Sequence, residues 1–271
     1  MIVQEVRARS ILSKSGIERI DYAINPYTGC AHGCVYCYAC FMRRFTGHEE
    51  RWGTFVDIKT NAVDLLRAQM PKHPAVRVML SSVTDCYQPI EAARRLTRGC
   101  LAVLAEYPFA EVSVLTKSAL VTRDLDILRT MPNVRVGMTL TTLDAAVASW
   151  MEPGATSPDG RLRALHVLAD AGIRTWAFLG PLLPGISDDE ESVAALLGAV
   201  ARAGVRSALI DPMNLYPSVR ASLITAYRAH CRAELPALLA ACRTPEAYRE
   251  RVREMADRAA SGAAVEVRSA R

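Results

Sequence analysis

The sequence lacks the features that carry a protein into or across a membrane. None of its apolar runs reaches the roughly 18 uninterrupted residues that a membrane-spanning helix needs. The first residues, MIVQEVRARSILSKSG, carry charges where a secretory signal peptide needs an apolar core. We therefore expect a cytoplasmic protein with no membrane partner, in a compartment where disulfides are rare.

Several catalytic signatures are also missing. The chain has no Walker phosphate-binding loop, no glycine-rich dinucleotide fingerprint and no Ser–His–Asp order. A strong charge imbalance is missing too, because the net charge is only +5. Acidic residues are interleaved with the arginines of the last third, which favours a solvated helical face over a nucleic-acid-binding surface.

Short apolar runs alternate with longer helical patterns through most of the 271 residues. The short runs are rich in β-branched residues and predict strands over residues 19–26, 76–82, 111–117, 134–141, 174–180 and 205–212. Amphipathic patterns predict helices over residues 60–70, 89–106, 159–171 and 187–203. Ser187 is the predicted N-cap of the last of these helices.

Six strand–helix units predict a parallel sheet with helical crossovers. Six units are too few for an eight-stranded barrel, so the predicted fold is α/β, a partial (β/α)6 TIM-type barrel with C-terminal helices. No linker or change of composition divides the chain. We expect one domain over residues 1–271, with a barrel core at about 20–215 and a helical extension at about 216–271.

Four of the eight cysteines fall within the stretch NPYTGCAHGCVYCYAC, residues 25–40. Disulfides, a structural zinc and a catalytic metal cluster are the competing explanations. The expected compartment disfavours disulfides. Structural zinc sites usually pair two cysteine knuckles, and the other cysteines of this chain are scattered. Cys30, Cys34 and Cys37 could instead hold three irons of a 4Fe–4S cluster and leave the fourth iron open.

Cys40 decides whether such a cluster is open or closed. As a fourth ligand it would close the cluster and indicate an electron carrier or a structural cluster protein. Its three-residue step from Cys37 turns it away from the same face of the cluster, so we expect it not to be a ligand. A non-enzymatic iron–sulfur or zinc-binding protein that uses all four cysteines is the alternative.

The segment CAHGCVYC resembles the cysteine signature of the radical S-adenosylmethionine (SAM) superfamily, with Tyr36 as the aromatic residue before the third cysteine. Together with SSVTDCYQPIE and LTKS, it is similar to the branch related to spore photoproduct lyase, which is also described as DNA repair photolyase-like. The similarity covers about residues 20–215. It implies a partial (β/α)6 barrel, in agreement with the strand count.

The resemblance implies an enzyme whose 4Fe–4S cluster, on Cys30, Cys34 and Cys37, cleaves SAM reductively. The 5′-deoxyadenosyl radical formed in this way takes a hydrogen atom from the substrate. A reducing donor of the flavodoxin or ferredoxin type would supply the electron. The resemblance further implies lyase or oxidoreductase chemistry, and it places Tyr36 and the main chain near it against the adenine.

The first predicted cofactor-binding residues follow strands two and three. Asp85, supported by Ser82 or Thr84, would hold the cationic amine of SAM. Its alternative role is to cap the helix that follows. Lys117 would pair with the SAM carboxylate, and the alternative is an ordinary solvated lysine at a strand end.

The remaining predicted cofactor contacts follow strands four and five. The hydroxyls of Thr139, Thr141 and Thr142 would bind the ribose or the carboxylate, with local turn bonding as the alternative. Gly180 resembles the late glycine-containing adenine contact of the family, although a turn that starts a helix explains the same stretch.

One position departs from spore photoproduct lyases. Those enzymes carry a hydrogen-donating cysteine where this chain has Ser82, and a hydroxyl is a far poorer hydrogen-atom donor than a thiol. Tyr36 and Tyr38, which flank the third cluster cysteine, are present. Cys86 completes the predicted catalytic residues as a substitute donor, unless it is a small buried filler.

The missing donor cysteine tilts the predicted substrate toward a small metabolite or a nucleoside-like molecule. Repair of pyrimidine lesions in DNA is the alternative within the same class of enzyme. DNA is therefore the less favoured partner.

Overall fold

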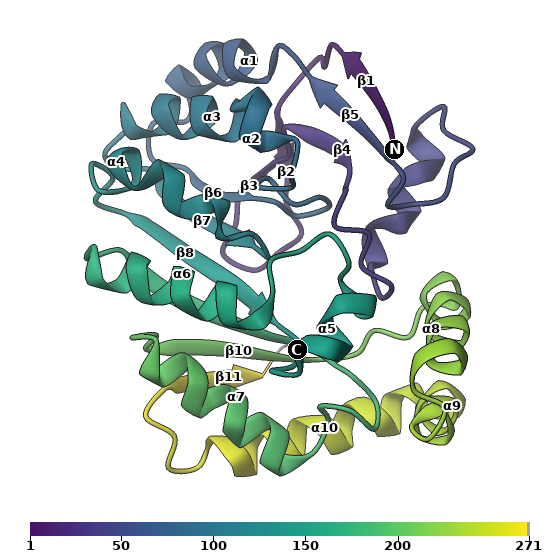
Figure 1. Ribbon diagram of the computed structural model, residues 1–271. Helices are drawn as coiled ribbons and strands as arrows, with labels where there is room; N and C mark the ends of the chain where they lie inside the picture. Colours follow the sequence, from purple (N-terminus) through teal and green to yellow (C-terminus); the bar gives the residue numbers. More distant parts are fainter. Residues whose placement is uncertain (270–271) are drawn as a thin grey trace.

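The computed structural model describes residues 1–269 as a long curved sheet, a small second sheet and a layer of helices (Figure 1). The long sheet has the strand order β11-β10-β9-β8-β7-β6-β3-β2. Its strands are β2 (Leu12–Lys14), β3 (Tyr22–Ile24), β6 (Arg77–Leu80), β7 (Glu111–Thr116), β8 (Val134–Leu140), β9 (Arg174–Leu182), β10 (Ser207–Pro212) and β11 (Glu266–Ser269). Neighbouring strands are parallel except for β2, which runs antiparallel to β3.

The six predicted strands are all present, as β3 and β6 to β10. Within the described residues the outermost strands, β2 and β11, do not pair with each other, so the sheet remains open. Six parallel strands joined by crossovers in an open sheet confirm the α/β class and the partial barrel.

Helices pack against the sheet and lie beyond its C-terminal part. They are α1 (Ala62–Gln69), α2 (Glu91–Arg94), α3 (Leu96–Ala105), α4 (Leu125–Leu128), α5 (Ala145–Met151), α6 (Pro158–Asp170), α7 (Glu190–Arg202), α8 (Pro217–His230), α9 (Leu235–Arg243) and α10 (Pro245–Ala260). Short 3-10 helices are η1 (Tyr38–Phe45), η2 (Met70–Lys72) and η3 (Ala119–Asp124). Three of the four predicted helices are confirmed as α1, α6 and α7.

The predicted helix over residues 89–106 is divided at Arg95, which has a φ of +52°. The Glu91 carboxylate accepts hydrogen bonds from the main-chain nitrogens of Thr97 (3.0 Å) and Arg98 (3.3 Å), so a second helix begins there.

The predicted cap of α7 at Ser187 is wrong. Asp189 caps this helix, because its carboxylate accepts a hydrogen bond from Ser192 N at 2.8 Å. The Ser187 hydroxyl accepts one from Leu183 N instead.

The C-terminal extension is helical through α8, α9 and α10, but it is not helical throughout. It ends in β11, which adds a parallel strand to the edge of β10. The prediction of helices alone was wrong here, because four residues are too short a run to be recognised from the alternation of apolar and polar side chains.

The two faces of the long sheet differ in polarity. Val78, Leu80, Val112 and Val114 point to the face that packs on α1 and α3, and an equivalent apolar cluster joins β8, β9 and β10 to α6, α7 and α10. Residues that alternate with these point to the other face. They include Ser113, Arg135 and Thr139, and Arg135 Nε donates to Ser113 Oγ at 3.2 Å. The inner face of the open barrel is therefore partly polar.

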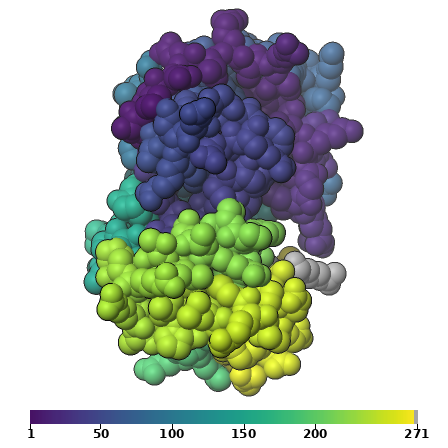
Figure 2. Space-filling model, turned by 90° about the vertical axis from the view of Figure 1, so that its right-hand side faces the viewer, coloured from purple at the N-terminus to yellow at the C-terminus, as the bar shows by residue number. Residues whose placement is uncertain are grey.

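A small sheet of β1 (Ile2–Val6), β5 (Phe55–Lys59) and β4 (Tyr27–Gly29), which the sequence analysis missed, encloses the cysteine segment. The strands β4 and β5 pair antiparallel, so residues 30–54 leave and return at the same place. Gly29 has a φ of +82°, and a Cβ there would lie 2.3 Å from Phe55 O, so glycine allows this pairing. Figure 2 shows the returning segment, in blue-violet, between the N-terminal residues and α8.

Candidate active site

The cysteines at positions 30, 34 and 37 lie in a tightly turned loop after β4. Hydrogen bonds join Gly33 N to Cys30 O (3.3 Å) and Cys37 N to Cys34 O (3.2 Å). Burial raises the pKa of the Cys30 thiol to about 12, and the Asp85 carboxylate and Cys37 add to this shift. Burial also holds the pKa of Cys34 well above its usual range, and Cys37 and Cys30 are among the charges that add to it. Because burial and neighbouring thiols disfavour the ionised forms of Cys30 and Cys34, a bound cationic centre would stabilise these residues as thiolates.

Cys37 and Cys40 have different surroundings. The indole of Trp52 donates from Nε1 to Cys37 Sγ at 3.2 Å. The Cys40 thiol donates instead to the hydroxyl of Ser218, on α8, at 3.4 Å. Among residues 1–269, no group of three or more Cys, His, Asp or Glu side chains is arranged to hold a single metal ion.

The cysteine loop is fixed by main-chain contacts with two distant segments. Gly154 N donates to His32 O at 2.9 Å and Val35 N donates to Met151 O at 2.9 Å, which ties the loop to the end of α5. The Gln88 side chain accepts from Ala31 N at 2.8 Å. The loop is therefore held in place by the segments that follow β6 and β8.

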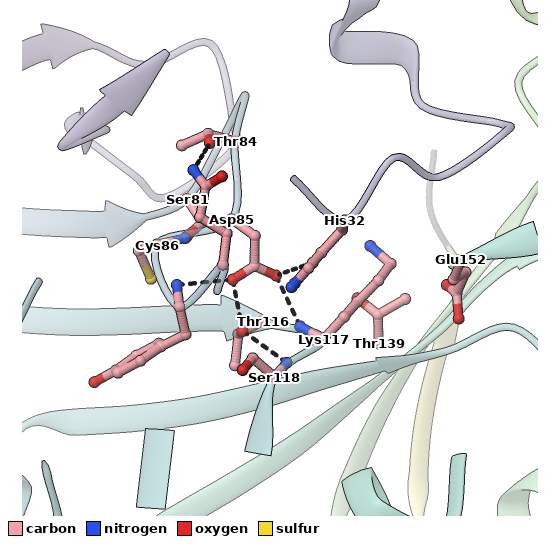
Figure 3. Close-up of polar contacts among 12 residues, drawn as sticks. His32, Ser81, Thr84, Asp85, Cys86, Thr116, Lys117, Ser118, Thr139 and Glu152 are labelled. Atoms are coloured by element: carbon pink, nitrogen blue, oxygen red, sulfur yellow. Dashed lines mark hydrogen bonds and ion pairs between the residues drawn. The ribbon is translucent and has the colours of Figure 1, made fainter. Parts of the chain in front are cut away.

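Asp85 lies at the centre of a hydrogen-bond network (Figure 3). One carboxylate oxygen accepts from Thr116 Oγ1 (2.7 Å) and Tyr87 N (2.9 Å). The other accepts from Lys117 N (2.8 Å) and lies 3.3 Å from Nδ1 of the buried His32. Burial opposes ionisation, but His32, Thr116 and the Lys117 ammonium outweigh it and hold the pKa of Asp85 below its usual range. The carboxylate is thus ionised and already occupied by the protein.

The Lys117 ammonium lies beside the cysteine loop. Its Nζ is 5.7 Å from the centre of the Tyr36 ring. Burial alone would lower its pKa, but Cys34 and the Glu152 and Asp85 carboxylates outweigh burial and raise it. The ammonium is therefore charged, and within residues 1–269 it has no carboxylate at ion-pair distance.

Tyr36 is buried, and its side chain is held by a network of polar residues. Its hydroxyl donates to Glu152, which also pairs with the fully buried Arg161 (Figure 3 shows Glu152 beyond Lys117). Arg161 in turn donates to Thr139 O at 2.9 Å and to Thr156 O at 2.6 Å. This network holds the aromatic residue of the cysteine motif in a single orientation.

Tyr38 and Ser82 meet on the other side of the loop. The Tyr38 hydroxyl donates to Ser82 O, and the Ser82 hydroxyl accepts from Asn25 Nδ2 at 3.0 Å. Thr84 donates to Gly29 O at 2.5 Å, so its hydroxyl secures the strand before the cysteines. The structure brings all three predicted residues close to the cysteine loop, Tyr38 and Ser82 at its surface.

The threonines after β8 differ in their bonding. Thr139, Thr141 and Thr142 are all buried. The Thr142 hydroxyl accepts from Asp144 N at 3.0 Å, which is the local turn bonding given as the alternative role of these threonines. The Thr141 hydroxyl is buried and has no hydrogen-bond partner among residues 1–269, which is a costly state unless a ligand supplies one.

Gly180 lies against Asp211, at the end of β10. A Cβ on Gly180 would lie 2.9 Å from Asp211 O, so only glycine lets the two strands approach this closely. Within residues 1–269 the Asp211 carboxylate accepts no hydrogen bond, and burial raises its pKa to about 6 against the opposing charge of nearby arginines. Asp211 also adds to the raised pKa of Tyr38, for which burial is the main cause.

Cys86 is the predicted site residue that the structure does not bring to the site. Its side chain is fully buried with Leu80, Leu101 and Val112, in the apolar layer on the helical face of the sheet. Burial holds the pKa of its thiol well above the usual range. The structure thus has Cys86 as a packed core residue, the alternative that the sequence left open.

The sequence analysis missed several residues of this site. His32, Trp52, Glu152, Arg161 and Asp211 were not predicted as site residues. For Asp211 a signal existed, because an acid ends the apolar run of the last predicted strand. The other four carry no local signal, since each acquires its role from a partner that is distant in the sequence.

The comparisons with known proteins agree with this geometry. The family model of the Radical SAM superfamily matches residues 24–197, which is more than half of the chain. This chain therefore belongs to the radical SAM superfamily. The protein MJ0683 of Methanocaldococcus jannaschii is 36% identical over 186 residues, which cover 69% of this chain and 70% of that protein. Rv2578c of Mycobacterium tuberculosis is 29% identical over 286 residues, covering 93% and 82%.

Solved structures share the fold. Spore photoproduct lyase complexed with dinucleoside spore photoproduct superposes with a TM-score of 0.75 at 17% identity, covering 99% of this chain and 82% of that one. Streptococcus suis SuiB bound to S-adenosylmethionine gives a TM-score of 0.60 at 11% identity, covering 92% and 50%. In the part of the chain that the structure describes, no helix is long and apolar enough to cross a membrane.

Radical SAM enzymes use a 4Fe–4S cluster and SAM, and a spore photoproduct lyase structure has AdoMet bound. The residues present here fit both groups. Three cysteines lie in one turned loop, and among residues 1–269 the Lys117 ammonium has no carboxylate at ion-pair distance and the buried Thr141 hydroxyl has no hydrogen-bond partner. Each of these features is unfavourable in an isolated protein and is satisfied by such ligands.

Proposed function

We propose that this chain is an enzyme in which Cys30, Cys34 and Cys37 hold a 4Fe–4S cluster with one open iron. The observation that carries the proposal is the separation of the fourth cysteine. The Cys40 thiol donates to the hydroxyl of Ser218, on α8, and it is not among the charges that raise the pKa of Cys30 and Cys34, although it adds to the raised pKa of Cys37. A closed cluster or a four-cysteine zinc site needs all four sulfurs on one centre.

When bound, the cluster and SAM supply one-electron cleavage of the sulfonium, with the electron from a flavodoxin- or ferredoxin-type donor, and a radical that takes hydrogen from a substrate C–H bond. The residues of this chain bind and orient the cofactor. Lys117 would hold the SAM carboxylate through its charge, and Thr141 would donate to the ribose or the carboxylate.

Asp85 and Tyr36 would act by position rather than by direct contact. The Asp85 carboxylate accepts from Lys117 N and orients His32, so it fixes two segments that border the cofactor. The Tyr36 hydroxyl is occupied by Glu152, which leaves the main chain of residues 36–38 to face the adenine.

The substrate that the site supports best is a small or nucleoside-like molecule. No thiol is available where spore photoproduct lyases carry their donor, since Ser82 stands there and Cys86 is buried in the core. Repair of a pyrimidine lesion in DNA is the second candidate, favoured by the fold shared with spore photoproduct lyase. Binding of lesion-bearing DNA over a series of salt concentrations separates the two, because contacts with phosphates weaken steeply with salt.

The central test compares Cys37→Ala with Cys40→Ala after anaerobic reconstitution. Cys37→Ala is expected to lose the cluster, measured as iron and sulfide per chain and by its absorbance, and to form no 5′-deoxyadenosine after reduction with SAM present. Cys40→Ala is expected to keep both properties, because its thiol bonds to Ser218. An equal loss of iron in the two variants would contradict the open-iron proposal and favour a closed four-cysteine centre.

A further inference from the structure

A cavity of about 350 Å³ opens beside the cysteine loop, at the edge of the long sheet formed by β3 and β2. We call it the edge pocket and define it by Lys14, Asn25, Tyr38, Met42, Lys59 and Ser82, which line it. Its volume is at the lower end of the ~300–1,000 Å³ of small-molecule sites. Tyr38 follows the third cluster cysteine directly, so the pocket adjoins the proposed radical site.

The charge of the edge pocket has one sign. Among the described residues that line it, Lys14 and Lys59 are charged and no aspartate or glutamate is present. Neither ammonium has an ion-pair partner within residues 1–269. Lys59 is half-buried, its Nζ donates to Asn25 O at 2.8 Å, and burial lowers its pKa despite the neighbouring Asp57. An ammonium held in a concave and partly desolvated position is stabilised by an anion that reaches it.

The rest of the lining suits an organic body attached to that anion. The Ser82 hydroxyl accepts from Asn25, so its own proton is free to be donated to a ligand. Met42, Ile17 and Val83 provide apolar surface. A pocket that combines a charged end, a few hydroxyls and an apolar wall is typical of small-molecule recognition rather than of an extended nucleic-acid surface.

We propose that the edge pocket binds the anionic group, a phosphate or a carboxylate, of a small organic substrate, with Lys59 and Lys14 as its partners. The inference rests on the proposed function, because it takes Tyr38 and Ser82 to border the volume in which hydrogen abstraction occurs. The substrate class that follows is a small monoanionic or dianionic molecule, such as a nucleoside monophosphate, and not a neutral nucleoside or a DNA duplex.

The test measures binding to the reconstituted protein by calorimetry, separately from SAM cleavage. The probes are inorganic phosphate, acetate, uridine, uridine 5′-monophosphate and a single-stranded oligonucleotide. Uridine 5′-monophosphate is expected to bind at least tenfold more tightly than uridine. Inorganic phosphate and acetate tell which anion the pocket prefers, and the preferred one is expected to compete with the nucleotide.

Lys59→Gln and Lys14→Gln are each expected to weaken binding of the nucleotide about tenfold, since each removes one charge-assisted contact. Lys72→Gln, at an exposed lysine of η2, is the matched control and is expected to leave binding unchanged. Lys14 is exposed, so its variant tests the pocket even if Lys59→Gln were to fold poorly.

Two results would overturn the inference. One is that neither anion nor nucleotide binds at millimolar concentration, or that the two lysine variants bind like Lys72→Gln. The other is an oligonucleotide that binds more tightly than the mononucleotide and depends on the same two lysines. Formation of 5′-deoxyadenosine is measured in the same preparations, because it tests the proposed function independently. A protein that cleaves SAM but binds no anion would contradict only the inference about the edge pocket.

Discussion

Two carboxylates near the C-terminal ends of parallel strands, one buried and one half-buried, have opposite surroundings. Asp85, after β6, accepts three hydrogen bonds and lies beside His32. Asp211, at the end of β10, accepts none within residues 1–269, and burial raises its pKa to about 6. The first is held as an anion by the protein, and the second gains stability when it is protonated.

The difference separates a side of the candidate site whose carboxylate is fully bonded within the protein from a side whose polar groups lack partners among residues 1–269. On the β6 and β7 side, the carboxylate joins the cysteine loop to two strands, and its bonding capacity is used up. On the β8 to β10 side, the Thr141 hydroxyl and the Asp211 carboxylate take part in no side-chain hydrogen bond among residues 1–269. Buried polar groups without partners concentrate where a protein binds something.

The largest effect is expected for Asp85→Asn. The asparagine side chain keeps the volume of the aspartate but loses its charge. An NH2 group replaces one of the two carboxylate oxygens, and it cannot accept a hydrogen bond such as the one from Lys117 N. We therefore expect a loss of about 3–5 kcal/mol in the free energy of unfolding at pH 7. Urea denaturation of the protein without cofactors measures it. Because the native pKa of Asp85 lies below 3.8, its contribution is present above about pH 4 and is lost as the pH falls toward the native pKa.

Asp159→Asn, at an exposed acid in the first turn of α6, is the control and should change stability little. An equally small effect of Asp85→Asn would show that the two sides of the site do not differ as the structure indicates.

Asp211→Asn is expected to act in the opposite direction. The native pKa of about 6 lies above the usual 3.8, so the folded state loses stability as the pH rises between these values. Replacing the acid should therefore stabilise the protein by about 1–2 kcal/mol at pH 7.5, allowing for its partial exposure, and should have no effect at pH 4. Thermal unfolding at the two pH values measures this, and destabilisation at pH 7.5 would mean that the carboxylate has a partner after all.

The smallest effect is expected for the reduction potential of a cluster bound to the cysteine loop. Trp52→Phe removes the hydrogen bond to Cys37 Sγ, and hydrogen bonds to cluster sulfurs raise the reduction potential. We expect the reduction equilibrium of the reconstituted cluster to shift up to tenfold toward the oxidised form, about 59 mV for one electron. Trp150→Phe, at a tryptophan that stacks on His230, should leave the potential unchanged. An unaltered potential in Trp52→Phe with the cluster intact would mean that the indole does not tune it.

The sequence could predict the features of the fold and the candidate site that depend on residues close together in the chain. Periodic apolar runs gave the six parallel strands, and the spacing of Cys30, Cys34 and Cys37 gave the loop on which the proposed site depends. The same spacing indicated that Cys40 stands apart, and its bond to Ser218 agrees with that expectation.

The parts that could not be predicted depend on contacts between distant segments. The bonding of Asp85 needs His32 from the cysteine loop and Thr116 and Lys117 from the end of β7, two segments that are distant from it in the sequence. The orientation of Cys86 depends on the turn at Ser81, where φ is +75° and the chain leaves the alternation of the strand. Residue propensities do not predict a positive φ at a serine, so the sequence could not indicate the face of the sheet to which Cys86 points.

The last strand has a consequence for edge-to-edge association of the protein. An unpaired strand edge offers main-chain donors and acceptors to any other polypeptide, and aggregation begins there. By lying alongside β10 in parallel, β11 covers the edge of β10 and becomes the outermost strand on that side of the sheet. The edge that this side of the sheet exposes is therefore only four residues long, and a short edge strand is one of the ways in which proteins limit edge-to-edge association.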